Sequence, residues 1–228
     1  MIDLWHLTNL NWMSHLAGPT AENLRQSAEC RKFAVGEQVF GPDSEPDMVF
    51  VLESGMVRIY RVSAEAEEVT FGYIQPGEIF GESALFHDQP RESQAVAVEP
   101  AVVLILKRDD FLAVMRETPV IGYSVSMQIE GRFKSIETRV EDLVFRSAPN
   151  RLAHILLQLA QQFGRKEGKC TVLPMQLTHN DLATLIGTSR PTVSLAIADL
   201  EQQKLIARRG RYISIENMNK LSQAIEKL

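Results

Sequence analysis

The side chains best suited to chemistry lie at the start of a helical pattern between residues 190 and 200. If the apolar Val193, Ile197 and Leu200 face a core, four neighbouring residues must face outward. The outward set is Arg190, Thr192, Ser194 and Leu195. An arginine at the exposed start of a helix can bond two acceptors on a guanine edge, and short polar side chains can reach bases or phosphates. This pattern predicts recognition of double-stranded DNA in its major groove.

The residues before this helix predict the elements that position it. Thr178 can cap a preceding helix, and Asp181 in the first turn favours the positive end of that helix. Gly187 can adopt the positive φ angle of a tight turn, and Ser189 can cap the second helix with Pro191 in its first turn. The segment therefore predicts a helix-turn-helix, with a helical hairpin that binds nothing as the alternative.

A basic turn follows the second helix. Leu205–Ala207 and Tyr212–Ile215 have the pattern of short strands, and they flank the arginine-rich turn Arg208–Arg211. A wing of this kind places arginines where they reach phosphates. Residues 148–228 carry eleven Lys and Arg against six Asp and Glu, whereas residues 1–147 carry thirteen against twenty-three. The net charge of -5 therefore hides a basic C-terminal third that can attract DNA.

Length, composition and cysteine count exclude several classes of protein. With 228 residues and 45% hydrophobic side chains, the chain is expected to fold as one large or two modest domains. No apolar stretch is long enough for a membrane span, so we expect a cytoplasmic protein with no membrane partner. Cys30 and Cys170 are too few for a disulfide framework or a metal cluster, and we expect no metal site. No P-loop, GxSxG or HExxH motif is present, which predicts a protein that is not an enzyme.

A long helical pattern runs from Pro119 to about Phe145. Its apolar positions alternate spacings of four and three residues, which is typical of a coiled-coil seam. The seam residues are Ile129, Phe133, Ile136, Val140 and Leu143. Charged residues flank them, so we expect a two-stranded homodimer, with a helix packed on its own domain as the alternative.

The residues between Arg31 and Lys107 have the pattern of strands. Short runs rich in Val, Ile, Phe and Tyr, such as Val57–Val62, are separated by glycines and prolines. Evenly spaced short strands predict an all-β sandwich or barrel. Before them, residues 4–28 have a loosely helical pattern in which Thr20 could cap a short helix.

The order of these modules resembles the CRP/FNR family of bacterial transcription regulators. The resemblance covers nearly the whole chain and rests on Gly36-Glu37, Gly55, the run Pro76–Glu82 and the turn Gly187–Val193. It implies a homodimer that binds a two-fold-symmetric site on double-stranded DNA. It also implies an activator that recruits RNA polymerase.

The resemblance implies an α+β fold in three parts. Residues 1–118 form a cyclic-nucleotide-binding-type sensor domain built as a double-stranded β-helix (jelly-roll-like). Residues 119–147 form a dimerisation helix, and residues 148–228 form a C-terminal winged helix-turn-helix that binds DNA.

By position, the resemblance assigns base reading to Arg190, and Ser194 and Leu195 lie on the same open face. The positions assigned to the DNA backbone are Thr178, Asn180, Ser189, Thr192, Arg209, Gly210 and Arg211. Cyclic-AMP-type regulators have a glutamate where this chain has Pro191 and a second arginine where it has Leu195. Pro191 cannot accept a hydrogen bond from cytosine, and Leu195 offers only apolar contact, for example to a thymine methyl. We therefore expect a DNA site that differs from the cyclic-AMP-type site at those two positions.

The resemblance also marks a possible effector pocket, whose residues are Gly81, Glu82, Ser83, Arg91, Ser93 and Ile136. In cyclic-nucleotide binders an arginine beside a hydroxyl cradles the phosphate, whereas here Glu92 follows Arg91 and its carboxylate would repel a phosphate. A shift of one residue would bring in Ser93, and a surface Arg91 paired with Glu92 is a further alternative. The Thr-Ser pair that holds adenine is replaced by Ile136-Glu137. Both departures predict that cyclic AMP is not the effector.

The sequence contains few residues that could hold a metal-containing cofactor. An iron–sulfur cluster of the FNR type needs four cysteine ligands, which this chain lacks. A haem needs axial ligands, but His6, His15 and His87 have no diagnostic spacing and are expected to be surface or structural residues. We expect His154 and His179 to be structural or close to phosphate. Haem, another small molecule and regulation without an effector all stay open.

Overall fold

The computed structural model describes residues 26–225. The chain divides into two compact units: the first ends at Ser135, and the second begins at Ile136 and includes the short stretch Glu68–Thr70. Nearly all of the loosely helical pattern over residues 4–28, including the possible cap at Thr20, lies outside the described residues. His6 and His15 also lie outside them.

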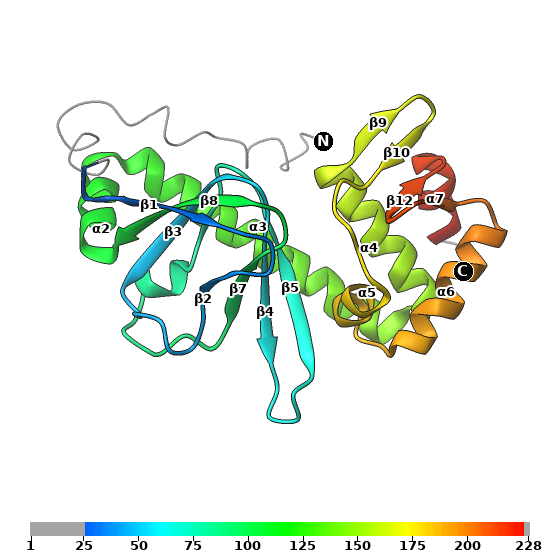
Figure 1. Ribbon diagram of the computed structural model, residues 1–228, viewed down its shortest axis with the longest axis horizontal. Coiled ribbons are helices and arrows are strands. Elements are labelled where there is room, and N and C mark those ends of the chain that lie inside the picture. The colour runs from blue at the N-terminus through cyan, green and yellow to red at the C-terminus, as the bar shows by residue number, and fades with distance from the viewer. Residues whose placement is uncertain (1–25, 226–228) are drawn as a thin grey trace. The chain divides into compact units, whose positions relative to one another are not determined.

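The first unit contains two four-stranded sheets (Figure 1). One has the strand order β1-β8-β3-β6 and the other has the order β2-β7-β4-β5. The strands are β1 (Glu29–Phe33), β2 (Gln38–Phe40), β3 (Met48–Ser54), β4 (Val57–Val62), β5 (Glu68–Ile74), β6 (Ile79–Phe80), β7 (Gln94–Ala97) and β8 (Ala101–Lys107). A short 3-10 helix, η3 (Glu82–Leu85), follows β6, and α2 (Arg108–Glu117) follows β8. This double sheet confirms the sensor part of the expected α+β fold.

Strand β3 shows how the sequence builds the core of this unit. Its side chains point alternately to the two faces of the sheet, as strand geometry requires. Phe50 and Leu52 enter one buried cluster, in which the rings of Phe50 and Phe40 lie 5.0 Å apart. Val49 and Val51 enter a second cluster, which also contains residues of α2 and of the helix that follows it. The strand therefore joins the double sheet to the helices behind it.

Helix α3 (Pro119–Phe145) has the bounds that the periodicity predicts. Ile121 and Val125, in its first turns, belong to the core of the first unit, and Ile129 packs against the same cluster. The other four seam residues are between 42% and 60% exposed, namely Phe133, Ile136, Val140 and Leu143. Packing on the chain's own sheet thus explains the start of the helix and leaves most of the apolar seam open.

The second unit combines helices with a small sheet (Figure 1). Its helices are α4 (Ala148–Phe163), α5 (His179–Ile186), α6 (Arg190–Gln202) and α7 (Met218–Ile225). The sheet has the order β11-β12-β10-β9, from β9 (Arg165–Glu167), β10 (Cys170–Val172), β11 (Ile206–Arg209) and β12 (Tyr212–Ile215). Helices α5, α6 and α7 all pack against α4. This arrangement confirms the predicted winged helix-turn-helix.

Helix α4 begins at Ala148, so only Arg146 and Ser147 separate it from the end of α3. Among residues 26–225, none of the helices has the length and apolar character needed to cross a membrane.

Candidate nucleic-acid interface

Two caps and one glycine fix the helix-turn-helix. Thr178 Oγ1 accepts a hydrogen bond from the backbone N–H of Asp181 at 3.1 Å, and the Asp181 carboxylate accepts from the Thr178 N–H at 2.8 Å. Gly187 ends α5 with a φ angle of 61°. At the start of α6, Ser189 Oγ accepts from the Thr192 N–H at 3.4 Å. Both caps and the glycine turn therefore form as the residue types predict.

Helix α6 has one buried face and one open face. Val193, Ile197 and Leu200 are at most 2% exposed, as their spacing predicts. On the opposite side, Arg190 is exposed and Leu195 is 75% exposed. Leu195 therefore contributes little to the packing of its own unit. The other two residues of the outward set, Thr192 and Ser194, are half-buried.

The wing is a two-stranded hairpin with a basic turn. Strands β11 and β12 pair as far as Arg209 and Tyr212, and Gly210 turns the chain with a φ angle of 64°. Arg209, Gly210 and Arg211 are all exposed. A guanidinium nitrogen of Arg209 lies 3.4 Å from a carboxylate oxygen of Glu167 on β9, which is a surface pair that adds little stability. The arginines of the turn are therefore accessible to phosphates.

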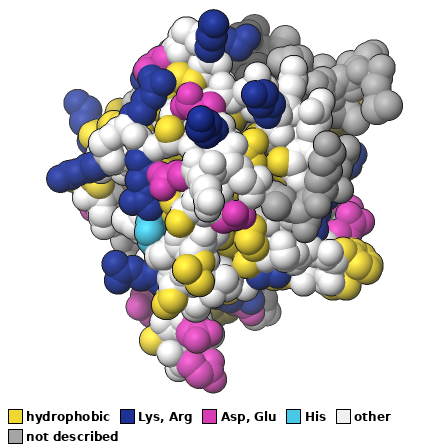
Figure 2. Space-filling model, turned by 90° about the vertical axis from the view of Figure 1, so that its right-hand side faces the viewer, with side chains coloured by type: hydrophobic (Ala, Val, Ile, Leu, Met, Phe, Trp, Pro, Cys, Tyr) yellow, Lys and Arg dark blue, Asp and Glu magenta, His cyan; other side chains and the backbone are white. Residues whose placement is uncertain are grey.

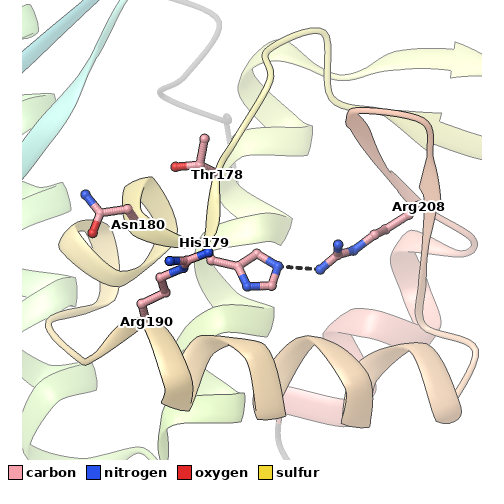
Figure 3. Close-up of a pocket in the computed structure, with 5 residues that line it drawn as sticks. All are labelled: Thr178, His179, Asn180, Arg190 and Arg208. Atoms are coloured by element: carbon pink, nitrogen blue, oxygen red, sulfur yellow. Dashed lines mark hydrogen bonds between the residues drawn. The ribbon is translucent and has the colours of Figure 1, made fainter.

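An open pocket of about 450 Å³ lies between the start of α5, the start of the recognition helix α6 and strand β11 of the wing. Thr178, His179, Asn180, Arg190 and Arg208 line it (Figure 3). In Figure 3 the His179 ring points toward Arg208, while Thr178 and Asn180 lie at the start of α5. Figure 2 shows the face at the right of Figure 1, where Lys and Arg side chains gather beside a histidine, with acidic side chains between them. Three predicted DNA contacts, Thr178, Asn180 and Arg190, thus share one basic pocket.

His179 and Arg208 are the two residues of this pocket that the sequence pattern did not assign to DNA contacts. The sequence pattern predicted Arg208 only as part of the basic turn, and it predicted His179 only as a structural residue or one close to a phosphate. The structure adds a hydrogen bond from an Arg208 guanidinium nitrogen to His179 Nε2. Because 29 residues separate the two, no local spacing could have indicated this contact.

In the first unit, Arg91 is a buried residue. It is 5% exposed, and its guanidinium donates to the backbone carbonyls of Glu45, Pro46, Met48 and Gly81. It also lies over the ring of Phe40, 4.6 Å from the ring centre. Burial lowers the pKa of Arg91. Four of its five N–H donors are therefore used within the fold.

The alternative in which Arg91 lies on the surface and pairs with Glu92 is wrong. The Glu92 carboxylate is exposed and pairs with Arg61 on β4. Arg91 is buried because its guanidinium finds partners inside the fold. A loop before β3 supplies backbone carbonyls as acceptors, and the rings of Phe40 and Phe50 lie against the guanidinium. These partners lie more than forty residues away along the chain.

The other predicted pocket residues of the first unit have varied surroundings. Gly81 has a φ angle of 69°, and a Cβ there would lie 2.7 Å from the Phe50 ring. A Glu82 carboxylate oxygen lies 2.9 Å from an Arg132 guanidinium nitrogen on α3. Ser83 is exposed and Ser93 is half-buried. The structure therefore brings Gly81, Glu82 and Arg91 into one polar network around β6.

Two further predicted residues, one from the predicted effector pocket and one a candidate haem ligand, are exposed. Ile136, on α3, is 42% exposed. His87, the one candidate haem ligand among the described residues of the first unit, is exposed in the loop after η3. Within residues 26–225, no group of three or more His, Cys, Asp or Glu side chains is placed to hold a metal ion.

A double-sheet domain, a long helix with an open apolar seam, and a winged helix-turn-helix with an open basic face together define the class: a two-domain, DNA-binding transcription regulator. Comparison with known proteins agrees. Residues 30–118 match the cyclic nucleotide-binding domain, and residues 150–224 match the Crp-like helix-turn-helix domain.

Whole-chain relatives extend this result. The chain is 30% identical over 191 residues to the CRP-like cAMP-activated global transcriptional regulator of Mycobacterium tuberculosis, which covers 84% of this chain and 85% of that protein. It is 32% identical over 177 residues to the Cyclic AMP receptor protein of Thermus thermophilus, with 77% and 78% covered. A solved CooA variant from Carboxydothermus hydrogenoformans shares the fold, with a TM-score of 0.80, 23% identity, and 97% and 99% of the two chains covered.

The chain belongs to the CRP/FNR family of transcription regulators. It is therefore a DNA-binding regulator with an effector-binding type of domain, and its family is not one of enzymes.

Proposed function

We propose that this regulator binds a two-fold-symmetric DNA site as a homodimer and reads base edges with Arg190, Ser194 and Leu195. The observation that carries the proposal is the open face of α6, where Arg190 and Leu195 are exposed while the opposite side is fully packed. An arginine in this position can bond the two acceptors of a guanine. The phosphate contacts fall to Thr178, Asn180, Ser189, Thr192, Arg209, Gly210 and Arg211.

The preferred site differs from the cyclic-AMP-type site at two positions. Pro191 has no group that accepts from a cytosine amino group, and Leu195 offers an apolar surface that suits a thymine methyl. Each altered contact changes discrimination by ~1–3 kcal/mol. Selection of an unchanged cyclic-AMP-type half-site would contradict this assignment.

The dimer forms along α3. In one chain the apolar seam is exposed to water at Phe133, Ile136, Val140 and Leu143. Burying this surface in a dimer stabilises the dimer by about 25 cal/mol per Å² of apolar surface. Two copies joined there present their recognition helices to successive major grooves, about 34 Å apart. Residues 1–118, 119–147 and 148–228 then act as sensor, dimer helix and DNA reader.

Cyclic AMP is not the effector in this proposal, although the names of two relatives refer to it. Arg91 is the candidate for phosphate binding, but four of its five N–H donors already bond to backbone carbonyls. The next residue, Glu92, offers no hydroxyl to a phosphate, and its carboxylate pairs with Arg61 instead. Bound nucleotide would have to break these hydrogen bonds, so the residues present do not fit a cyclic nucleotide.

We assign the regulator a role as an activator that contacts RNA polymerase in the cytoplasm, as the family resemblance implies. The experiment is a selection of binding sites from random duplex DNA by the purified protein, with and without cyclic AMP. The expected result is one two-fold-symmetric site, enriched equally in both arms. Enrichment only with cyclic AMP would contradict the effector proposal, and no enriched site would contradict specific DNA binding. An absorption spectrum of the same sample tests for haem.

A further inference from the structure

The structure assigns a specific task to His179: we propose that its neutral form holds the wing against the recognition helix, so that sequence-specific DNA binding is lost when this histidine is protonated. His179 is thus a positioning residue, because it acts through Ser194, Arg190 and Arg208. This inference rests on the proposed function, and it adds a dependence on pH to that function.

The contacts of His179 define a single direction of hydrogen bonding. Arg208 can only donate, so His179 Nε2 must accept from it and the ring proton must lie on Nδ1. Nδ1 lies 2.7 Å from Ser194 Oγ and therefore donates to it. The Ser194 hydroxyl in turn donates to the backbone carbonyl of Arg190 at 3.1 Å. These hydrogen bonds connect Arg208 on the wing, through His179 on α5 and Ser194 on α6, to Arg190 at the start of α6.

The charged groups around His179 favour this neutral form. Arg208 on β11 and Arg190 on α6 are the cationic neighbours, and Glu201 on α6 is the acidic one. The Glu201 carboxylate is partly engaged, since it lies 3.5 Å from Arg208 Nε. Burial first, and then the two arginines, lower the pKa of His179. The ring is therefore neutral at neutral pH and can accept from Arg208.

Protonation would reverse the contact. A protonated His179 has an N–H at Nε2, which faces the Arg208 guanidinium and cannot accept from it. The wing then loses its bond to the two helices. The added positive charge, however, lies in a basic pocket and favours any DNA phosphate. Acid should therefore lower the affinity for the specific site and leave non-specific affinity unchanged or higher.

The test compares wild type with His179→Gln. The glutamine side-chain oxygen can accept from Arg208, as Nε2 does, but it does not titrate. The measurement is the ratio of affinities for the selected site and for unrelated DNA, at about pH 7.5 and about pH 5.5. For wild type we expect this ratio to fall about tenfold on acidification, because the hydrogen bond from Arg208 to His179 is lost. For His179→Gln we expect a ratio that does not change with pH, and His87→Gln, at an exposed position of the first unit, is the control that should behave as wild type.

The folded state of each variant is checked by circular dichroism at both pH values. If His179→Gln does not fold, a histidine titration by NMR replaces it, in which a Ser194→Ala variant should show a changed titration for His179 only. A wild-type ratio that does not change with pH, or an equal fall in His179→Gln, would overturn the role of His179 while leaving DNA binding intact. Absence of any selected site at either pH would instead overturn the proposed function, and this inference with it.

Discussion

His154 Nδ1, on α4, lies 2.5 Å from a carboxylate oxygen of Asp142 near the end of α3. The other Asp142 oxygen accepts from Arg146 Nε at 2.8 Å. Asp142 is only 8% exposed, so this is a largely buried carboxylate with two donors. Asp142 therefore connects the end of α3 to α4 across the short non-helical segment at Arg146 and Ser147.

Replacing Asp142 with Ala should destabilise the second unit. The change leaves the half-buried His154 N–H without its acceptor, which costs ~1–3 kcal/mol of unfolding free energy. Urea unfolding followed by circular dichroism measures the loss. The control is Glu141→Ala at the exposed neighbouring position, which should stay within about 0.5 kcal/mol of wild type. Equal losses in the two variants would mean that the buried carboxylate has no special role.

Gly187 and Gly168 form a matched pair for a second prediction. Their φ angles are 61° and 63°, so alanine is strained at both by ~1–2 kcal/mol. A Cβ at Gly168 meets nothing within 4 Å, whereas a Cβ at Gly187 would lie 2.9 Å from Leu143 Cδ2. We expect Gly187→Ala to lower the melting temperature more than Gly168→Ala. The double variant Gly187→Ala/Leu143→Ala should lose less melting temperature than the sum of the losses in the two single variants. A double-variant loss equal to that sum would contradict the contact between residue 187 and Leu143.

The exposed seam predicts the oligomeric state. Val140 is 54% exposed in one chain, so Val140→Glu should leave the monomer folded and place a charge in the dimer contact. We expect sedimentation to change from dimer to monomer and DNA affinity to fall by more than tenfold. Glu137→Ala, on the same helix outside the seam, should remain dimeric. A wild-type protein that sediments as a monomer at all concentrations would contradict the seam.

Arg91 provides a test that separates structure from ligand binding. Arg91→Ala should destabilise the first unit by at least about 2 kcal/mol, because buried carbonyls lose their donor. Arg91→Lys should recover only part of this loss, since an ammonium cannot reproduce the planar set of donors. Cyclic AMP should not raise the melting temperature of the wild-type protein. A rise that depends on cyclic AMP concentration would show that Arg91 is available to a phosphate after all.

The local features of the DNA-binding unit could be predicted from the sequence. The caps at Thr178 and Ser189 and the turn at Gly187 depend on residues at most a few positions away, and all three form as expected. The same holds for α3, whose long periodic pattern gives its bounds.

Contacts between distant parts of the chain could not be predicted in this way. The surroundings of Arg91 depend on a loop more than forty residues earlier, and the bond between His179 and Arg208 spans 29 residues. Tertiary packing decides both, and no spacing in the sequence encodes it. The sequence therefore predicted the caps, the turn and the open face of α6 more fully than the long-range contacts around Arg91 and His179.

A scan of every base pair in the selected half-site, with wild type and Arg190→Ala, tests most directly the claim that Arg190 reads a base. For wild type we expect one guanine whose replacement lowers affinity by about tenfold or more, equivalent to ~1–3 kcal/mol. For Arg190→Ala we expect discrimination to vanish at that position alone while preferences elsewhere persist. An Arg190→Ala protein that kept the full affinity and the full preference of wild type at every position would contradict the claim.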